Sequence, residues 1–336
     1  MRGENRRPSP PDVDGAISEI AALLKDGVRF LLLTHVDPDA DGIGSMLALG
    51  RSLSDGGKDV VLVTPEPLPE PLNRLQDADR IVSGHPEGRF DVVAALDCAE
   101  KERLGSLADH VKGPAYTINI DHHDTSDGFG MLNLNDPAAS STGELVFRIL
   151  QKAGFPICKD AAANLFAAIQ ADTGSFRYSN TTAGAMRMAA ELIDLGAKPW
   201  EISRDIMDGY GMARLKLLEL ALATMEFYFE GRLGMMILDR HMFTLTGAEP
   251  IDCERFVDYP RFVRGVEIAA VIREIGKHRY KCSLRSNTRV NVARLASDFG
   301  GGGHQRAAGF ECHGSVDGIK RDFLTEAGRF LNGIPG

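Results

Sequence analysis

Short apolar segments alternate with helix-like segments along the first half of the chain, and this alternation limits the fold more than any other feature of the sequence. Each apolar segment has the length of a buried strand, and the stretch 42–57 between the first two has a helical pattern. Such alternation predicts an α/β fold in which a parallel sheet carries helices on both faces. The predicted strands are residues 28–35, 59–65, 90–97 and 115–121.

The character of the sequence changes after residue 225. Helical patterns dominate residues 140–225, whereas strand-like segments separated by glycine turns follow. We expect one hairpin around Glu230-Gly231, a second pair of strands turning near Gly276-Lys277, and a final helix over 316–332. This pattern predicts a smaller α+β domain, set across a cleft from the first. The expected divisions are a disordered tail (1–18), a first domain (19–200), a helical linker (201–222) and a second domain (223–336).

The charge of the chain bears on what it binds. A formal net charge of -9 argues against a protein that coats long duplex nucleic acid. The charge is unevenly distributed, however, because residues 261–294 hold nine Lys and Arg but only two acids. A basic region within an acidic chain suits a small anionic ligand, although a solvated strand face gives the same pattern.

Three features indicate a cytoplasmic location. No apolar run reaches the roughly 18 residues that a membrane helix needs, so we expect no membrane partner. The first 15 residues are polar and contain several prolines, which predicts a disordered tail rather than a signal peptide. The five cysteines are odd in number and lack C-x-x-C spacing, which argues against a disulfide framework or a zinc cluster.

Acidic and histidine residues follow three of the four predicted strands. Because the carboxyl ends of parallel strands line the ligand crevice of an open α/β sheet, these side chains are expected to converge. Clustered carboxylates repel one another unless cations neutralise them. Carboxylate together with imidazole suits Mn, Fe or Zn better than it suits Mg or Ca, so we predict a metal site. The candidate residues are His35, Asp37, Asp39, Asp41, Asp97, Asp121, His122, His123 and Asp124.

Asp172 adds a further carboxylate at the end of a predicted helix. A negative charge at a helix C-terminus is unfavourable, and a metal ion would compensate for it. The alternative is that Asp172 merely caps the turn before Gly174. Taken singly, each of these residues has a structural explanation, such as a solvated loop for Asp37. Their joint occurrence at strand and helix ends favours a functional site.

These residues resemble the motifs of the DHH phosphoesterase superfamily, which is named for the triplet present here as Asp121-His122-His123. The motif H-x-x-x-D-x-D matches the segment His35–Asp41 and leaves Asp37 outside the ligand set. A single acid after the next buried strand matches Asp97. An acid followed by Thr-Gly matches Asp172.

The C-terminal part resembles the DHH-associated second domain of the same superfamily. The matching stretches are SLRSN at 283–287 and GGGGHQRAAGF at 300–310, so the resemblance covers roughly residues 20–332. Within the superfamily the chain is similar to bifunctional oligoribonucleases that are also PAP phosphatases (nanoRNases). RecJ-type exonucleases carry an additional nucleic-acid domain, and family II pyrophosphatases lack the glycine-rich ending.

The resemblance implies two metal ions, most simply Mn²⁺ with Mg²⁺ or Co²⁺ as alternatives, and a role for each residue. The first ion is expected on His35, Asp39 and Asp97. The second is expected on Asp41, Asp97, His122 and Asp172, with Asp97 bridging the two. His123 is expected to contact the phosphate, and the catalytic residues are taken as His123, Asp97 and Asp121.

Two cations held in this way are expected to activate a bridging water for attack on phosphorus. His123, when protonated, either stabilises charge on the phosphate or protonates the leaving group, and the sequence leaves both roles open. Phe176 or Tyr178, just after Asp172, is a candidate for stacking on a base, with core packing as the alternative.

The second domain is expected to bind the substrate. Arg285 can grip a phosphate through two hydrogen bonds. The glycine run that begins at Gly300 allows backbone amides to face an anion, although a flexible linker has the same composition. The candidate substrate-binding residues are Arg285, Ser286, Asn287, Gly301, Gly302, Gly303, His304 and Arg306.

We therefore expect an enzyme that hydrolyses RNA or DNA oligonucleotides of two to five nucleotides and dephosphorylates 3′-phosphoadenosine 5′-phosphate (PAP). Alternatives are a phosphodiesterase for cyclic or linear dinucleotides, a RecJ-like single-strand exonuclease, and a non-catalytic nucleotide-binding regulator. The sequence lacks the H-E-x-x-H and H-x-E…C-x-x-C patterns of metalloproteases and deaminases. A homodimer is a further hypothesis.

Overall fold

The apolar runs of the first half pair as one parallel sheet in the computed structural model, which describes residues 12–113, 116–207 and 211–333. The strand order is β3-β2-β1-β4-β5-β6, and all neighbouring strands are parallel. The sheet therefore confirms the predicted α/β class. Its strands are β1 (Arg29–Thr34), β2 (Asp59–Thr64), β3 (Ile81–Ser83), β4 (Val92–Leu96), β5 (Tyr116–Asp121) and β6 (Leu132–Asn135).

The order of the strands places a topological switch point between β1 and β4. From β1 the chain proceeds outward through β2 and β3, and it then returns to the other side of β1 to form β4, β5 and β6. Leu33 of β1 is accordingly paired with Val63 on one side and with Ala95 on the other. At such a reversal the two connections leave in opposite directions and open a space for a ligand.

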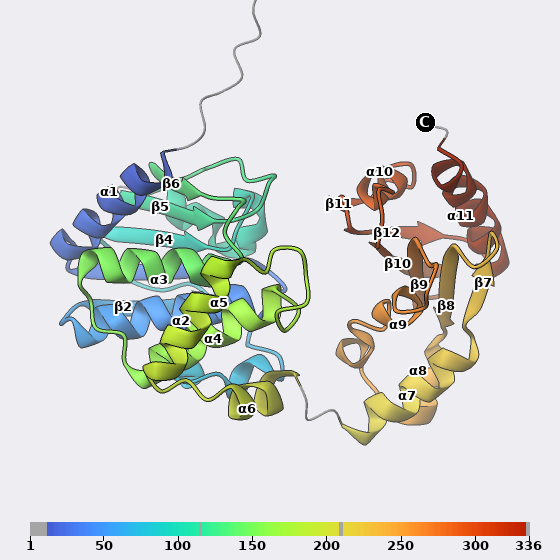
Figure 1. Cartoon of the computed structure of the whole chain (residues 1–336), viewed down its shortest axis with the longest axis horizontal. Coiled ribbons are helices and arrows are strands. Elements are labelled where there is room, and N and C mark those ends of the chain that lie inside the picture. The colour runs from blue at the N-terminus through green and yellow to red at the C-terminus, as the bar shows by residue number, and fades with distance from the viewer. Residues whose placement is uncertain (1–11, 114–115, 208–210, 334–336) are drawn as a thin grey trace, which may run out of the picture. The chain divides into compact units, whose positions relative to one another are not determined.

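Helices cover both faces of this sheet, as predicted, but in different ways (Figure 1). On one face the large hydrophobic core packs beneath a layer of α-helices. On the other face Leu104, Leu107 and Val111 of a 3-10 segment pack on the sheet. The first group comprises α1 (Val13–Asp26), α2 (Ala40–Asp55), α3 (Thr142–Ala153), α4 (Lys159–Asp172) and α5 (Ala183–Asp194), and the 3-10 segment is η3 (Lys101–Lys112).

The helix α1 begins earlier than the expected tail allows. The sequence predicts a disordered tail over residues 1–18, but residues 13–18 form the first turns of α1. The side chain of Asp12 accepts a hydrogen bond from the amide of Gly15 at 2.9 Å, which satisfies an amide that the helix itself leaves unpaired. Ile17 and Ile20 are buried in the core, so apolar contact holds the helix down. Residues 1–11 lie outside the described part of the chain.

The short strands β3 and β6 were not predicted. With three and four residues they lie below the length at which a strand pattern is recognisable. Several short helical turns complete the first unit of the chain, Met1–Gly209. These are η1 (Leu72–Arg74), η2 (Ala78–Arg80), α6 (Pro199–Ile202) and the π-turn η4 (Ser203–Met207).

The second unit, Tyr210–Gly336, contains a separate six-stranded sheet in the order β11-β12-β10-β9-β8-β7. The strands β8 and β9 are parallel and the other pairs are antiparallel. Both predicted strand pairs and the final helix are confirmed. The strands are β7 (Glu226–Tyr228), β8 (Leu233–Leu238), β9 (Ile268–Gly276), β10 (Arg279–Ser286), β11 (Gly302–His304) and β12 (Ala307–His313).

Alternation along β9 divides the second unit into two cores. Ala270 and Ile272 face the core that α10 and α11 cover, whereas Ala269 and Val271 face the core that α7 covers (Figure 1). Both faces of the sheet are thus buried along the middle of the strand. The helices are α7 (Met212–Ala223), α8 (Arg240–Thr246), η5 (Pro250–Cys253), α9 (Asp258–Arg261), α10 (Val292–Ser297) and α11 (Val316–Leu331). No helix within the described ranges is long and apolar enough to cross a bilayer.

Candidate metal centre

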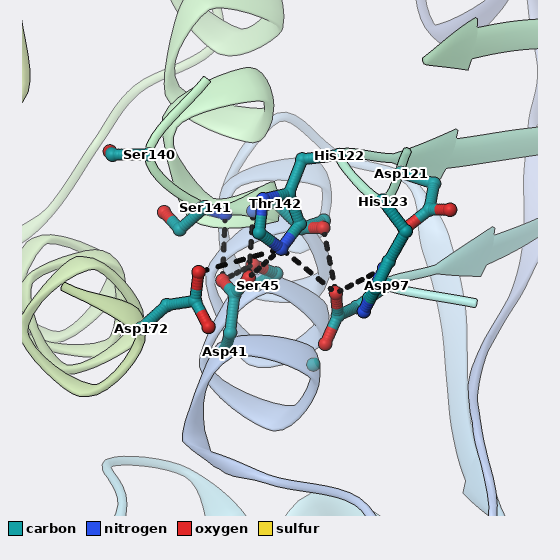
Figure 2. A network of polar contacts seen from close by, with 12 residues as sticks. Asp41, Ser45, Asp97, Asp121, His122, His123, Ser140, Ser141, Thr142 and Asp172 are labelled. Carbon is teal, nitrogen blue, oxygen red and sulfur yellow. Dashed lines mark hydrogen bonds and ion pairs between the residues drawn. The ribbon is translucent and has the colours of Figure 1, made fainter. Parts of the chain in front are cut away.

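The predicted acids and histidines of the first unit converge at the carboxyl ends of three adjacent strands. His35 follows β1, Asp97 follows β4, and His122 and His123 follow β5. The helices α2 and α4 complete the cluster from the covering layer (Figure 2). The helix α2 contributes Asp39 as its N-cap and Asp41 in its first turn, and α4 contributes its last residue, Asp172.

His122 lies at the centre of three carboxylates. Its Nε2 atom is 3.6 Å from an oxygen of Asp41, 3.7 Å from one of Asp97 and 3.5 Å from one of Asp172. Figure 2 shows the ring of His122 pointing toward these three side chains, which come from α2, the end of β4 and the end of α4. A side chain at similar distances from three acids is arranged as one member of a ligand set around a common point.

The two carboxylate oxygens of Asp97 face different histidines. Oδ2 is 3.5 Å from Nε2 of His35, and Oδ1 is 3.7 Å from Nε2 of His122. Asp97 is almost completely buried, which opposes ionisation, but the histidines outweigh this and lower its pKa to about 2. Its backbone has a φ of 57°, a left-handed conformation that is strained for an aspartate and frequent at functional sites.

Asp41 is held by the amino end of α3. One carboxylate oxygen accepts from the amide of Thr142 at 2.7 Å and the other from the amide of Gly143 at 2.9 Å. Burial, together with the charges of Asp97 and Asp172, nevertheless raises the pKa of Asp41 well above its usual range. The helix end supplies only part of the positive charge that a buried acid cluster requires.

Asp172 is positioned by Asn180. The side-chain amide of Asn180 donates to the backbone carbonyl of Asp172 at 3.1 Å and to its carboxylate at 3.3 Å, and it also donates to the carbonyl of Ser140 at 2.9 Å. Partial burial and the charges of Asp39 and Asp97 raise the pKa of Asp172 to about 6, although His122 opposes this. The unfavourable carboxylate at the end of α4 is therefore present as predicted, and its surroundings are acidic.

His35 presents Nε2 to the cluster and uses Nδ1 for support. Nδ1 lies 2.8 Å from the carbonyl oxygen of Val36 and 2.9 Å from the guanidinium of Arg103. Only a protonated Nδ1 can donate to the Val36 carbonyl, and that tautomer leaves the lone pair of Nε2 free. A metal ion selects this tautomer, so Val36 is the partner that suits metal binding.

Asp121 holds His123. The carboxylate Oδ1 of Asp121 accepts from Nδ1 of His123 at 2.6 Å, and Asp121 is completely buried. Burial lowers the pKa of His123, but the hydrogen bond and charge of Asp121 outweigh it and raise this pKa to about 9. The second oxygen of Asp121 is buried without a hydrogen-bond partner among the described residues. The pair forms an oriented imidazole beside the acid cluster.

The chemistry of this cluster fits divalent cations. Two groups of three residues each bring one ligand atom per residue within 4.8 Å of the others: His35 with Asp39 and Asp97, and Asp41 with His122 and Asp172. A third such group consists of Asp97, His122 and His123. Buried acids with raised pKa values are repelled by one another, and cations remove that repulsion. Mixed imidazole and carboxylate donors suit a transition metal.

Several residues of the centre were not predicted from the sequence. Thr142 and Gly143 start the helix that holds Asp41, and the hydroxyl of Thr142 donates to Asp97 at 3.1 Å. A signal for this helix start was present, because Ser141-Thr142-Gly143-Glu144 has the S-x-x-E spacing of a capping box. Ser141 accepts from the amide of Glu144 at 3.2 Å, as that motif requires. Arg103 and Asn180 carry no comparable local signal.

The remaining candidates of the first unit belong to none of the three-residue ligand groups. Asp37 and Asp124 are exposed, and Asp37 has a φ of 51° in the loop before α2. Phe176 packs against the core and meets Phe166 edge-to-face at 5.9 Å between ring centroids. Core packing therefore accounts for Phe176. The ring of Tyr178 lies over Gly174, where a Cβ atom would approach it to 2.3 Å.

Among the candidate substrate residues of the second unit, the two arginines are at least partly exposed, whereas Ser286 and Asn287 are held in place by the rest of the fold. Arg285 is half-buried at the end of β10, and Arg306 is exposed in the turn before β12. Ser286 is buried. The side-chain amide of Asn287 donates to the carbonyl oxygens of Arg261 and Val266 at 2.7 and 3.2 Å, so it supports a loop.

The glycine run forms an edge strand, because Gly302 to His304 pair with β12. A Cβ atom at Gly301 would lie 2.2 Å from the carbonyl oxygen of Gly309, and one at Gly303 would lie 2.5 Å from that of Ala307. Gly303 also has a φ of 139°. Close strand pairing thus requires these two glycines, whereas Gly302 has no atom within 4 Å of its Cβ position.

Comparison with known proteins places these two units in one family. The model of the "DHH family, N-terminal domain" matches residues 29–169, and the model of the "DHHA1 domain" matches residues 241–332. A protein of Thermus thermophilus named bifunctional oligoribonuclease and PAP phosphatase NrnA is 33% identical over 83% of this chain and 82% of its own length. A protein of Streptococcus mutans named as a probable enzyme of the same kind is 28% identical over 88% of this chain and 93% of its own length.

A solved structure agrees over almost the whole chain. The exopolyphosphatase-related protein of Bacteroides fragilis has a TM-score of 0.89 at 26% identity and covers 96% of this chain and 98% of its own. The metal-ligand candidates lie within or just beyond the matched DHH domain, and Arg285 and the glycine run lie within the matched DHHA1 domain. The chain belongs to the DHH family of phosphoesterases and carries both the DHH domain and the DHHA1 domain.

Proposed function

We propose that this phosphoesterase hydrolyses oligonucleotides of two to five nucleotides to mononucleotides and also dephosphorylates PAP. The observation that carries the proposal is the position of Asp97, whose two oxygens face two different groups of metal-ligand candidates. The names of the relatives from Thermus thermophilus and Streptococcus mutans, both oligoribonucleases and PAP phosphatases, support the choice of substrates.

Two divalent cations, most simply Mn²⁺, complete the proposed site. One is assigned to His35, Asp39 and Asp97, and the other to Asp41, Asp97, His122 and Asp172. When bound, such ions supply Lewis-acid chemistry, because they withdraw charge from phosphoryl oxygens and make water more acidic.

The chain itself orients the reacting groups. The Asp121 carboxylate accepts from Nδ1–H of His123 and orients this ring beside the acid cluster, and we assign the imidazole to donate a proton or a hydrogen bond to a phosphate oxygen. The α3 amides fix the Asp41 carboxylate, and Asn180 fixes that of Asp172. Because these ligands are held before the substrate arrives, little reorganisation is needed during the reaction.

We assign substrate binding in the second unit to Arg285 and Arg306, together with the open backbone at Gly302. A guanidinium suits a phosphate because it offers two parallel donors. The other candidates next to them, Ser286 and Asn287, are proposed to shape this surface rather than to touch the substrate, because one is buried and the other supports a loop. We further propose that the enzyme acts in the cytoplasm on single-stranded RNA or DNA.

The test is mononucleotide release in Mn²⁺ from a length series consisting of PAP, two- to five-mers and a 24-mer. We expect rapid turnover of PAP and the short species, and slow turnover of the 24-mer. The variant His122→Ala removes the side chain at the centre of three carboxylates and is expected to lose activity on every substrate. Faster cleavage of the 24-mer than of the short species would reject the proposed substrate range and favour a RecJ-like exonuclease.

A further inference from the structure

The second unit contains a cavity that neither the metal centre nor the proposed substrate surface accounts for. Its volume is about 520 Å³, and it lies between α8, the start of η5 and the last residues of β9. Sites that hold a small organic ligand typically have 300–1,000 Å³, so the size is sufficient. The lining residues are Arg240, Phe243, Thr244, Ala248, Pro250, Arg273, Glu274 and Ile275.

The lengths of two strands explain why the cavity is there. The parallel pair β8–β9 ends at Leu238 opposite Arg273, and the chain then leaves the sheet to form α8. The strand β9 continues to Gly276. By alternation Arg273 lies on the same face as Val271, which belongs to the α7-side core. Arg273 itself is only half-buried, and it lines the cavity together with residues of α8.

The charges of the cavity favour an anion. Arg240 and the half-buried Arg273 both line it, and neither guanidinium has a hydrogen-bond or ion-pair partner among the described residues. The single acid in the lining, Glu274, accepts a hydrogen bond from the backbone amide of Arg240 at 3.1 Å. Two unpaired guanidiniums beside one engaged carboxylate leave net positive charge and up to ten N–H donors for a ligand.

The rest of the lining favours an apolar group attached to that anion. Phe243 and Ile275 are half-buried, and Ala248 and Pro250 contribute further apolar surface. An aromatic ring and aliphatic side chains next to guanidiniums match a nucleotide, whose base has a flat apolar face and whose phosphate has a charge. Inorganic phosphate alone would leave this surface without a partner.

The cavity is distinct from the surface that contains Arg285. In the β9–β10 register Arg285 pairs with Ala269, which lies four residues before Arg273 on β9. At a strand rise of about 3.3 Å per residue the two positions are about 13 Å apart along the strand. The buried residue Val271 lies between them on the same face.

We propose that this cavity is a second nucleotide site, in which Arg240 and Arg273 hold the phosphate of a nucleoside monophosphate while Phe243 and Ile275 contact its base. The proposal goes beyond the catalytic function and does not depend on it. A mononucleotide is also the product class of the proposed reaction, but binding at this site requires neither metal nor turnover.

The test is isothermal titration of the full chain with AMP in EDTA, which removes divalent metal and prevents catalysis. Wild-type protein is expected to bind AMP, and both Arg240→Gln and Arg273→Gln are expected to weaken binding about tenfold or more, because each removes charged hydrogen bonds. Adenosine, which lacks the phosphate, and inorganic phosphate, which lacks the base, are each expected to bind more weakly than AMP.

Two control variants separate this site from other arginines. Arg279→Gln removes an exposed arginine that pairs with Glu311 on the same sheet, and it is expected to leave AMP affinity unchanged. Arg285→Gln, in the proposed substrate surface, measures any AMP that binds there instead. The proposal is overturned if wild type does not bind AMP, if adenosine binds as tightly as AMP, or if only Arg285→Gln weakens binding. Circular dichroism of each variant verifies that it is folded.

Discussion

The carboxylate of Asp121 accepts a hydrogen bond from Nδ1 of His123 at 2.6 Å, although the two residues are only two positions apart in the chain. A completely buried acid that binds a histidine in this way fixes both the tautomer and the direction of the ring. The middle residue of the triplet, His122, points instead into the three carboxylates of the cluster. The DHH triplet thus combines one positioning acid, one ligand candidate and one oriented imidazole.

Asp121→Asn is expected to lower kcat by about 10- to 100-fold. The amide oxygen of asparagine accepts the hydrogen bond from Nδ1 of His123 more weakly than a carboxylate does, so it holds the tautomer of His123 less firmly. KM for a dinucleotide and the affinity for Mn²⁺ are expected to change little, since Asp121 does not belong to either three-residue ligand group around His122 or His35. The measurement is steady-state kinetics together with a metal titration. Asp124→Asn, an exposed acid next to the triplet, serves as the control and is expected to behave as wild type.

Divalent metal is expected to stabilise the first unit. The buried acids repel one another, and a ligand that binds only the folded state at 100 times its Kd adds about 2.7 kcal/mol. For a unit of this size the corresponding rise in Tm is about 5 to 10 °C. Differential scanning calorimetry in EDTA and in Mn²⁺ measures the difference. An equal rise in His122→Ala would show that the ions bind elsewhere.

Much of the first unit was predictable because its strands are continuous apolar runs and its acids directly follow them. A parallel sheet brings the ends of such strands to one edge, so the convergence of His35, Asp97 and His122 follows from the strand assignment. The order of the strands, which places β1 next to β4, is a tertiary property and was not available from the pattern.

The supporting residues were not predictable, because their contacts join distant parts of the chain. The amide of Thr142 bonds Asp41 across 101 positions, and no periodicity records that pairing. The strand β6 was missed because Leu132-Asn133-Leu134-Asn135 is short and half polar. The expected end of the tail was wrong, since one aspartate at the N-cap, Asp12, extends α1 to Val13.

Asn180→Ala is expected to weaken Mn²⁺ binding about 10- to 100-fold, because residues that orient a metal ligand contribute to affinity in this range. The variant loses the hydrogen bonds to the carboxylate of Asp172 and to the carbonyl of Ser140. A calorimetric metal titration gives the change directly. Gln151→Ala, which removes an exposed amide bonded to Glu191, is the matched control. Unchanged affinity in Asn180→Ala would assign Asn180 to loop structure alone.

The two glycines of β11 are expected to respond differently to alanine. Gly303→Ala places a Cβ atom 2.5 Å from the carbonyl oxygen of Ala307, at a φ of 139° that alanine does not tolerate. The free energy of unfolding of the second unit is therefore expected to fall by about 1 to 3 kcal/mol. Gly302→Ala meets no atom within 4 Å and is expected to leave the free energy of unfolding unchanged. Urea denaturation of both variants measures this difference.

The same pair separates a structural role of the glycine run from a binding role. If the backbone at Gly302 faces a substrate phosphate, a methyl group there obstructs its approach and raises KM for a dinucleotide several-fold while stability stays at the wild-type level. If KM is unchanged, the glycine run serves strand pairing through Gly301 and Gly303, and substrate recognition in the second unit rests on Arg285 and Arg306.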